Sequence, residues 1–335
     1  MKVTINDIAK LSGVSKATVS RVLNGSKPVS DQVRKKVMQA IEETGYKPSS
    51  LARSLTTKET KLIGIVIPDV SNPVFSELVK GMEDKSGESG YNVLLCNSYL
   101  SHKKELDYLE ILRDKEVDGI IFLTTNETAE QTAFFKDFGK PVVVVDRQFQ
   151  AMDLPSVGID DHKAAFTAVN YLINLGHKNI GMVRSALQDR SHGYNRYDGY
   201  CKAMEGAGLQ VNPDNVIEGD FSVKSGYNAM LKLLSSGKPP SAVFFANDLM
   251  AVGGIRCITD SGMKVPDDIS VMGFDDIPIS SMFIPSITTT RQPFFDIGSK
   301  AMEKLIDFIH KKEIEQYTVF ETDLMLRNST KRFEE

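Results

Sequence analysis

The feature that most constrains the fold is a regular alternation of short apolar runs with helix-forming stretches, which begins near residue 62. The runs LIGIVI, GIIFL and PVVVV have the length of buried strands, and longer amphipathic stretches separate them. The same order resumes near residue 179 with NIGMVRS, SAVFFAND and DISVMGF. Strands that alternate with helices are typical of parallel sheets covered by helices, so we expect an α/β core built from two comparable blocks.

Composition places the chain among ordinary globular proteins. Its 335 residues are 41% apolar and 25% charged, which is ample material for more than one domain. The first residues, MKVTINDIAK, do not resemble a secretion signal, and no run approaches the roughly 18 consecutive apolar residues of a membrane span. We therefore expect a cytoplasmic protein without a membrane partner.

Neither metal nor cofactor binding is indicated. The cysteines Cys96, Cys201 and Cys257 are far apart and have no CxxC or Cys/His ligand spacing, so we expect them to be small buried residues. The histidines are scattered, and we expect them in surface or loop positions: His102, His162, His177, His192 and His310. The sequence contains no P-loop, GxGxxG, GxSxG or HExxH motif, and we predict no enzymatic activity.

The charge is distributed unevenly along the chain. Residues 1–61 carry a net charge of +7, whereas the remainder carries −11. A basic N-terminal segment on an acidic body indicates that this segment alone meets a polyanion. Double-stranded DNA is the leading candidate.

The basic segment is predicted to form three short helices. Thr4 begins the first as the start of a capping box with Asp7, and Gly13 ends it. Ser15 begins the second, SKATVSRVLN, and Ser30 begins a third that closes the core. Two short helices joined by a glycine-containing turn are typical of the helix-turn-helix unit, whose second helix enters the major groove of DNA.

The polar side of the second helix carries side chains suited to DNA. Lysine and arginine bind guanine edges or phosphates, small apolar groups contact thymine methyls, and hydroxyls contact phosphates. An ordinary solvated helix face is the alternative interpretation. The candidate DNA-binding residues here are Thr4, Ser15, Lys16, Ala17, Thr18, Ser20, Arg21 and Asn24.

A short helix-favouring hexapeptide, SLARSL at residues 50–55, follows Pro48. Six residues are too few for a stable helix in water, because nucleation fixes several dihedral angles before the first hydrogen bond forms. The motifs DIAKLSGVSKATVSRVLNG, ETGYKPSSLARSL and LIGIVIPD together resemble the LacI/GalR family of bacterial transcriptional regulators, and the resemblance covers essentially the whole chain. It implies that the hexapeptide is a hinge helix that orders on DNA, with Ala52 and Leu55 contacting the minor groove and Leu55 acting as a wedge. A plain linker is the alternative.

The resemblance also implies a domain arrangement and partners. We expect a DNA-binding domain at residues 1–48, a hinge and linker at 49–60, and an effector-binding and dimerisation core at 61–335. The core resembles periplasmic binding proteins: an N-subdomain of about 61–160 and 290–320, and a C-subdomain of about 161–289 and 321–330. The family acts as homodimers on operator DNA, with a small-molecule effector between the subdomains.

Open α/β sheets bind ligands at the carboxyl ends of their strands, so residues that follow the apolar runs are candidates for the effector site. Acids, amides, arginine and aromatic rings together suit a sugar or a nucleoside. The resemblance assigns effector contacts to several of them, and the full set of candidates is Phe75, Arg147, Arg190, Arg196, Phe221, Asn247, Asp248 and Asp275.

Each candidate has a structural alternative. Asn247 or Asp248 could cap the following helix, Arg196 could pair with Asp198 at the surface, and Asp275 could cap a turn. Arg147, Arg190 and Arg196 together could also favour a carboxylated or phosphorylated sugar.

We expect a sequence-specific DNA-binding regulator, in particular a repressor of carbohydrate-utilisation genes controlled by a sugar-like effector. The alternatives are control by a protein corepressor or by a purine-type ligand. The sequence does not distinguish induction from corepression, identify the effector or the operator, or separate dimer from tetramer.

Overall fold

The computed structural model describes residues 3–24, 28–46, 59–124, 126–146, 149 and 151–334. The chain divides into two compact units: residues 1–62 with 116–118, and the remainder. The predicted hinge helix at residues 50–55, with Ala52 and Leu55, lies outside the described residues, and so does Arg147.

The first unit contains the predicted helix-turn-helix. Helices α1 (Ile5–Ser12), α2 (Lys16–Asn24) and α3 (Asp31–Thr44) each bury one aliphatic side chain completely, namely Ile8, Val19 and Val37. Before α1, the backbone N–H and the hydroxyl of Thr4 both donate to the Asp7 carboxylate, at 2.9 and 2.7 Å. Gly13 follows α1 with a φ of 67°, a left-handed conformation that lets the chain turn sharply toward α2.

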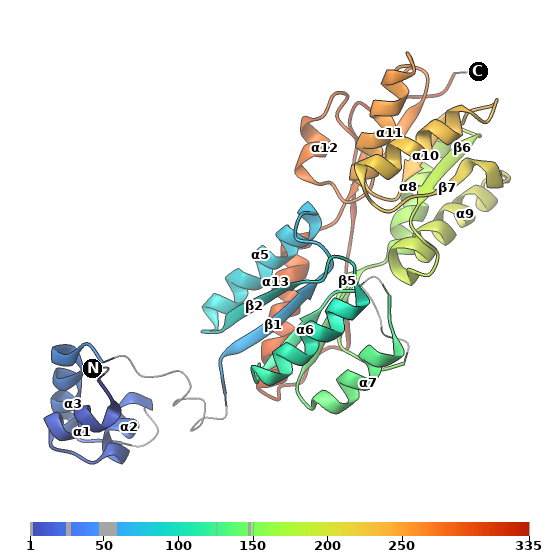
Figure 1. The fold of residues 1–335 in the computed structure, drawn as a ribbon. Helices are drawn as coiled ribbons and strands as arrows, with labels where there is room; N and C mark the ends of the chain where they lie inside the picture. Colours follow the sequence, from blue (N-terminus) through green and yellow to red (C-terminus); the bar gives the residue numbers. More distant parts are fainter. Residues whose placement is uncertain are drawn as a thin grey trace. The chain divides into compact units, whose positions relative to one another are not determined.

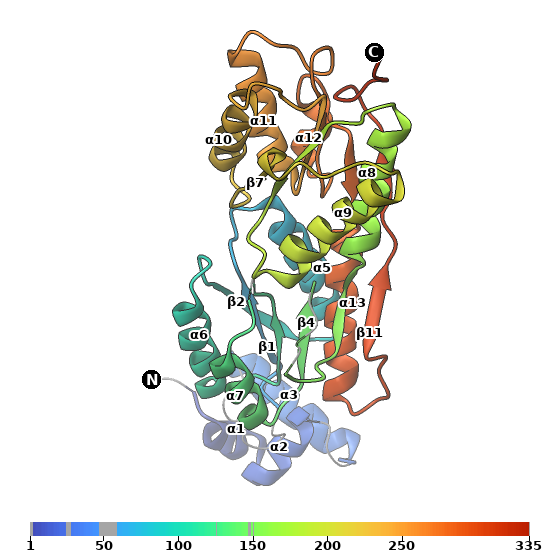
Figure 2. The same ribbon diagram turned by 90° about the vertical axis from the view of Figure 1, so that its right-hand side faces the viewer.

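The second unit begins with a parallel sheet whose strand order is β11-β5-β4-β3-β1-β2. We call this sheet and its helices the larger-sheet lobe. Its strands are β1 (Leu62–Ile67), β2 (Asn92–Asn97), β3 (Gly119–Phe122), β4 (Val142–Val145), β5 (Ser156–Ile159) and β11 (Tyr317–Phe320), and its helices are α5 (Pro73–Glu88), α6 (His102–Asp114), α7 (Ala129–Phe138) and α13 (Phe294–Ile309). Figure 2 shows α6 and α7 on one side of the sheet and α13 on the other.

A smaller parallel sheet of order β7-β6-β8-β9 forms the smaller-sheet lobe. Its strands are β6 (Ile180–Arg184), β7 (Val216–Glu218), β8 (Ala242–Phe245) and β9 (Ser270–Met272). The α-helices are α8 (Asp161–Asn174), α9 (Arg196–Gly206), α10 (Val223–Leu234), α11 (Asp248–Asp260) and α12 (Pro278–Met282), with a π-helix η1 (Arg190–Asn195) and a 3₁₀-helix η2 (Pro213–Asn215). The alternating side chains of β8 serve two cores, with Phe245 beside α10 and α11 and Phe244 beside α8 and α9.

The chain passes between the two lobes at separate places (Figure 1). It leaves β5 and enters α8, returns along β10 (Thr289–Arg291) to α13, and crosses again between β11 and β12 (Asp323–Met325). Strands β10 and β12 pair antiparallel, with Thr290 opposite Leu324. We call β10 and β12 the crossover strands. The predicted parallel α/β core is thus confirmed. Among the described residues, no helix is long and apolar enough to span a bilayer.

The structure refines two expectations about single residues. His177 lies in a loop, as the surface-or-loop expectation allowed, but it is only 2% exposed, and its ring contacts the Ser241 hydroxyl at 2.9 Å and the Lys331 carbonyl at 3.1 Å. A histidine is buried in this way when both ring nitrogens have partners. Cys96 and Cys257 are buried as expected, whereas Cys201 is half-buried.

Glycines allow the helices of each lobe to approach closely. A Cβ atom at Gly81 of α5 would lie 2.0 Å from the Phe295 carbonyl oxygen of α13, and one at Gly298 of α13 would lie 2.0 Å from the Leu78 carbonyl oxygen. Helices α10 and α11 meet in the same way, because a Cβ at Gly253 would lie 1.9 Å from the Val223 carbonyl oxygen. Backbone contact at these points requires the absence of a side chain.

This contact generates a prediction with a control on the same helix. Gly81→Ala should lower the free energy of unfolding by about 1–3 kcal/mol, because the methyl group forces α5 away from α13. Gly87→Ala, also in α5, meets no atom within 4 Å and should be neutral or stabilising by up to about 1 kcal/mol. Urea unfolding followed by far-UV circular dichroism measures both. Equal stabilities of the two variants would contradict the close packing.

Candidate functional site

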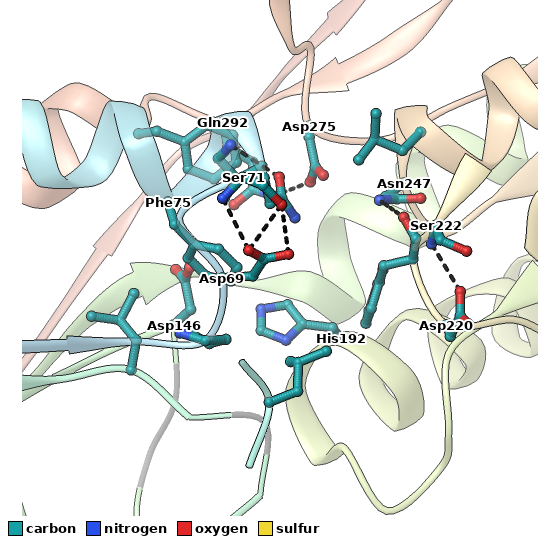
Figure 3. Close-up of a pocket in the computed structure, with 18 of the residues that line it drawn as sticks. Asp69, Ser71, Phe75, Asp146, His192, Asp220, Ser222, Asn247, Asp275 and Gln292 are labelled. Atoms are coloured by element: carbon teal, nitrogen blue, oxygen red, sulfur yellow. Dashed lines mark hydrogen bonds between the residues drawn. The ribbon is translucent and has the colours of Figure 1, made fainter. Parts of the chain in front are cut away.

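A cavity of about 430 Å³ lies at the carboxyl ends of the strands of both lobes. Figure 3 shows polar side chains converging on it from each side. The larger-sheet lobe supplies segments that follow β1, β3 and β4, and the smaller-sheet lobe supplies segments that follow β6, β7, β8 and β9. Its polar and aromatic lining consists of Asp69, Ser71, Asn72, Phe75, Thr124, Asp146, His192, Arg196, Asp220, Phe221, Ser222, Asn247, Asp275, Gln292 and Phe294.

The loop after β1 is fixed by its own side chains. The Asp69 carboxylate accepts hydrogen bonds from the Ser71 N–H at 3.0 Å and from the Ser71 hydroxyl at 2.8 Å. Asn72 caps α5 by accepting from the Val74 N–H at 3.1 Å, and Pro73 occupies the first turn. These bonds hold Phe75 at the cavity, where the sequence predicted an aromatic side chain.

Arg196 is the central buried charge of the site, with 2% exposure. Its Nε donates to Asp161 Oδ1 at 2.7 Å and its Nη1 donates to the Ala246 carbonyl at 2.6 Å. Nη1 also lies 3.7 Å from Asp275 Oδ1, and the guanidinium stacks over the Phe274 ring at 3.8 Å. The alternative pairing of Arg196 with Asp198 is wrong, because Asp198 contacts His162 at 3.2 Å instead.

Two cavity carboxyls are held in unusual environments. Asp275 has a φ of 112°, accepts from Gln292 Nε2 at 2.8 Å, and its pKa is raised to about 8 by burial despite Arg196. Asp146 has a φ of 58°, and its buried Oδ1 has no hydrogen-bond partner among the described residues. Burial raises the pKa of Asp146 to about 6. A buried acceptor without a partner is a natural contact for a ligand hydroxyl.

His192 lines the cavity, whereas the sequence predicted a surface or loop position for it. It lies in the π-helix η1, and its Nδ1 is 3.1 Å from the Asp189 carboxylate. Burial of the ring acts to lower the pKa of His192, yet the Asp189 and Asp161 carboxylates outweigh it and raise the pKa above its usual value. π-Helical turns are rare and occur often at functional sites, but they leave no periodic signal in a sequence.

Asn247 both caps a helix and lines the cavity. Its Oδ1 accepts from the Met250 N–H at 2.9 Å at the start of α11, and its Nδ2 donates to the Phe221 carbonyl at 3.1 Å. Phe221 has a φ of 66° and its ring meets the His192 ring edge-on at 6.3 Å. The capping role and the cavity position are therefore compatible.

Asp248 does not line the cavity. Its side chain is fully buried away from the cavity and accepts from the Thr289 and Ser280 hydroxyls and the Ile277 N–H, at 2.6, 2.7 and 3.0 Å. Asp248 begins helix α11, one residue after Asn247, and the helix start turns consecutive side chains in different directions. The side chain of Arg190 is outside the described residues.

The exposed face of α2 fits the predicted DNA contacts. Val19 and Val22 point into the core, whereas Ser15, Lys16, Ala17 and Arg21 are exposed. Ser15 Oγ accepts from the Thr18 N–H at 3.2 Å and contacts the Thr18 hydroxyl at 2.9 Å, which fixes the first turn of the helix. The side chain of Asn24 is outside the described residues.

A helix-turn-helix unit joined to a two-lobed α/β core with a polar cavity defines a ligand-responsive DNA-binding regulator. Residues 4–49 match the lacI family of bacterial regulatory proteins, and residues 60–325 match the periplasmic binding proteins and sugar binding domain of the LacI family. The chain belongs to the LacI family of DNA-binding transcriptional regulators.

Several relatives align with nearly the full length of the chain. The transcriptional regulator RegA of Clostridium saccharobutylicum is 41% identical over 98% of this chain and 100% of its own. Catabolite control protein A of Priestia megaterium is 40% identical over 95% of this chain and 96% of its own. The transcriptional repressor PurR of Pasteurella multocida is 37% identical over 98% of each.

Solved structures show the same fold. The lac repressor dimer bound to operator and the anti-inducer ONPF has a TM-score of 0.88 at 29% identity, over 99% of this chain and 100% of that chain. The complex of the regulator CelR with cellobiose has a TM-score of 0.75 at 30% identity, over 98% of this chain and 99% of that chain.

The raised pKa of Asp146 generates a prediction about pH. Between about pH 4 and pH 6 the folded protein retains a proton that the unfolded chain releases, so this group lowers the free energy of unfolding as the pH rises. Relative to the wild type, Asp146→Asn should therefore gain roughly 1–3 kcal/mol of stability between pH 4 and pH 7. Urea unfolding followed by circular dichroism at several pH values measures the difference, since the chain has no tryptophan.

Asp220, which lines the same cavity, provides a control whose contribution to stability has the opposite pH dependence. Hydrogen bonds from Ser222 hold the pKa of Asp220 below its usual value, so its contribution to stability is present at neutral pH and is lost as the pH falls. Asp220→Asn should lose stability at pH 7 and approach the wild type at low pH. A pH-independent difference for Asp146→Asn would show that its carboxyl is not perturbed by burial.

Proposed function

We propose that this protein is a homodimeric repressor of carbohydrate-utilisation genes whose operator affinity is set by a sugar or sugar derivative bound between the lobes. The observation that carries the proposal is the cavity itself. Asp146, Asp275, Asn247 and Gln292 offer hydroxyl-binding groups, and Phe75 and Phe221 offer aromatic faces. The relative CelR is named in complex with cellobiose, a sugar.

The electrostatics of the described lining favour an uncharged sugar over a phosphorylated or carboxylated one. Arg196 already has Asp161 and Asp275 beside it, and His192 has Asp189. Asp69, Asp146 and Asp220 add further carboxyl groups to the wall. Among the described side chains, the ionised acids would repel an anionic ligand, and the Arg196 guanidinium already has carboxyl partners. The effector therefore contacts the acids through its hydroxyl groups.

Control by such an effector follows from linkage. A ligand changes operator affinity only through different affinities for two arrangements of the protein, and the coupling between effector and operator is reciprocal. A lobe geometry that favours ligand and disfavours operator gives induction, and the reverse gives corepression.

A purine-type ligand is the second candidate, because Phe75 and Phe221 would also stack on a flat ring.

Binding of DNA generates a prediction about salt. Operator affinity should fall linearly on a log–log plot against salt concentration with a slope of several units, because lysines and arginines displace counterions from DNA. Arg21→Ala should weaken binding by about 1–3 kcal/mol, whereas Lys232→Ala on α10 serves as a control without effect. Lys16→Gln should change the base preference of selected sites. Equal affinity of the Arg21→Ala variant and the wild type would remove Arg21 from the interface.

The effector prediction is tested by thermal shift with a defined panel of neutral monosaccharides and disaccharides, their phosphates, and purine bases. At least one neutral sugar should raise the melting temperature, since a ligand at about 100 times its Kd adds about 2.7 kcal/mol. Asp275→Asn should reduce that shift, because the amide offers one oxygen to a ligand hydroxyl where the carboxyl group offers two. Stabilisation only by sugar phosphates would contradict the electrostatic argument, and stabilisation only by purines would favour the second candidate.

A further inference from the structure

The segment after β9 places two consecutive aspartates at different parts of the structure. Asp275 and Asp276 both have positive φ, 112° and 57°, which is uncommon for residues other than glycine. Asp275 faces the cavity, where Gln292 donates to it. The carboxylate of Asp276 points elsewhere, and its side chain is only 5% exposed. Two adjacent residues in rare conformations are retained only where the surrounding structure fixes them.

Asp276 binds both crossover strands through arginines. Arg291, the last residue of β10, donates from Nε to Asp276 Oδ2 at 2.7 Å. Arg327, two residues beyond β12, lies with Nη2 at 2.6 Å from Asp276 Oδ1. Each carboxylate oxygen thus has its own guanidinium, and each guanidinium comes from a different passage of the chain between the lobes. A nearly buried carboxylate requires such charged partners.

Backbone hydrogen bonds tie the same segment to β10. The Gly273 N–H donates to the Thr288 carbonyl at 2.9 Å, and the Asp275 N–H donates to the Thr290 carbonyl at 2.8 Å. Asp275 and Arg291 also form a parallel β-bridge. The side chains follow the same pairing: Gln292 donates to Asp275, and Arg291 donates to Asp276. Two consecutive residues after β9 therefore bind two consecutive residues at the end of β10.

Arg327 extends the connection to β12. Its Nη1 donates to the Ile287 carbonyl at 2.9 Å, and its backbone N–H donates to the Thr288 hydroxyl at 3.0 Å. The Arg327 side chain is 14% exposed, whereas that of Arg291 is 49% exposed. The Arg327 contact is therefore the better shielded of the two, and its loss should have the larger effect.

We propose that Asp276 is a positioning residue that locks crossover strands β10 and β12 to the cavity wall, so that displacement of Asp275 by a ligand moves the junction between the lobes. The ligand-dependent part rests on the proposed function. Asp275 senses the ligand, and Asp276, which touches no cavity space, passes the displacement to both crossover strands. Without the Asp276 carboxylate, the cavity wall still binds ligand, but ligand binding displaces the junction between the lobes less.

The test measures the junction directly in the full chain without any ligand. Spin labels are placed on Glu130→Cys in α7 and Lys232→Cys in α10, both at exposed positions, with Cys201→Ser to remove the half-buried native thiol. Labelled chain is mixed with excess unlabelled chain so that any assembly carries one labelled copy. Pulsed electron paramagnetic resonance then gives the distribution of distances between the lobes.

In Asp276→Asn the distribution should widen roughly twofold, because the amide replaces one charged oxygen and the crossover strands gain freedom. Glu321→Gln is the matched control: it weakens the exposed pair between Lys163 of α8 and Glu321, which lies between β11 and β12, and should leave the width unchanged. The two side chains are 61% and 84% exposed. An unchanged width in Asp276→Asn, or an equal widening in Glu321→Gln, would overturn the proposal. Arg327→Met replaces Asp276→Asn if that variant does not fold.

A second measurement separates this inference from the proposed function. With the most stabilising sugar of the panel as probe, the ratio of operator affinities with and without sugar should fall at least about fivefold in Asp276→Asn, toward unity. The affinity for the sugar itself should change less than about threefold, because Asp275 and Arg196 remain in place. A ratio equal to that of the wild type would overturn the proposal. If no sugar binds, the proposed function fails, and the distance distribution still decides the role of Asp276.

Discussion

The buried ion network of Arg196 is the interaction on which the site depends. A guanidinium at 2% exposure is stable only because Asp161, Asp275 and the Ala246 carbonyl surround it. These partners come from the start of α8, the end of β9 and the end of β8, so one side chain fixes the positions of separate strand ends. Removing it would leave uncompensated carboxyl groups in a nearly dry environment, and the cavity wall would have to rearrange.

The network also explains why the remaining cavity acids are poised for a ligand. Arg196 lies beside the carboxyl groups of Asp161 and Asp275, and burial outweighs its attraction and raises the pKa of Asp275 to about 8. Asp146 faces the same cavity from the other lobe, with a buried oxygen that no described group satisfies. The cavity thus has an unsatisfied acceptor on the side of the larger-sheet lobe and a buried carboxyl group on the side of the smaller-sheet lobe. A ligand that bridges the two sides stabilises one arrangement of the lobes over others. Backbone strain gathers at the same place, at Asp146, Phe221 and Asp275.

The lobes themselves are rigid bodies suited to such a rearrangement. Backbone contact at Gly81, Gly298 and Gly253 packs paired helices too closely to slide without loss of contact. A rearrangement of the lobes would change the contacts where the chain passes between them, and there directional ion pairs and hydrogen bonds accompany apolar contacts such as that of Ile277 with the core of the larger-sheet lobe. Asp276 with Arg291 and Arg327 is the shielded part of that junction, and Lys163 with Glu321 is the exposed part.

The sequence by itself determined whatever rests on local pattern. Periodicity predicted the helix-turn-helix and the parallel α/β core, and Thr4, Gly13 and Ser15 marked the helix ends, because capping and turn formation depend on residues only a few positions apart. It also placed Phe75, Arg196, Phe221, Asn247 and Asp275 at strand ends that line the cavity. Only the tertiary structure decided which of two consecutive residues at a strand end faces the cavity. Asn247 lines the cavity, whereas Asp248 accepts hydrogen bonds from buried hydroxyl groups. Asp275 lines the cavity, whereas Asp276 binds the arginines of the crossover strands. A π-helical turn places His192 at the cavity, and Asp161 binds Arg196 although the two residues are 35 positions apart in the sequence. Side-chain direction and long-range pairing depend on the packing of whole elements, and no window of the sequence contains that information.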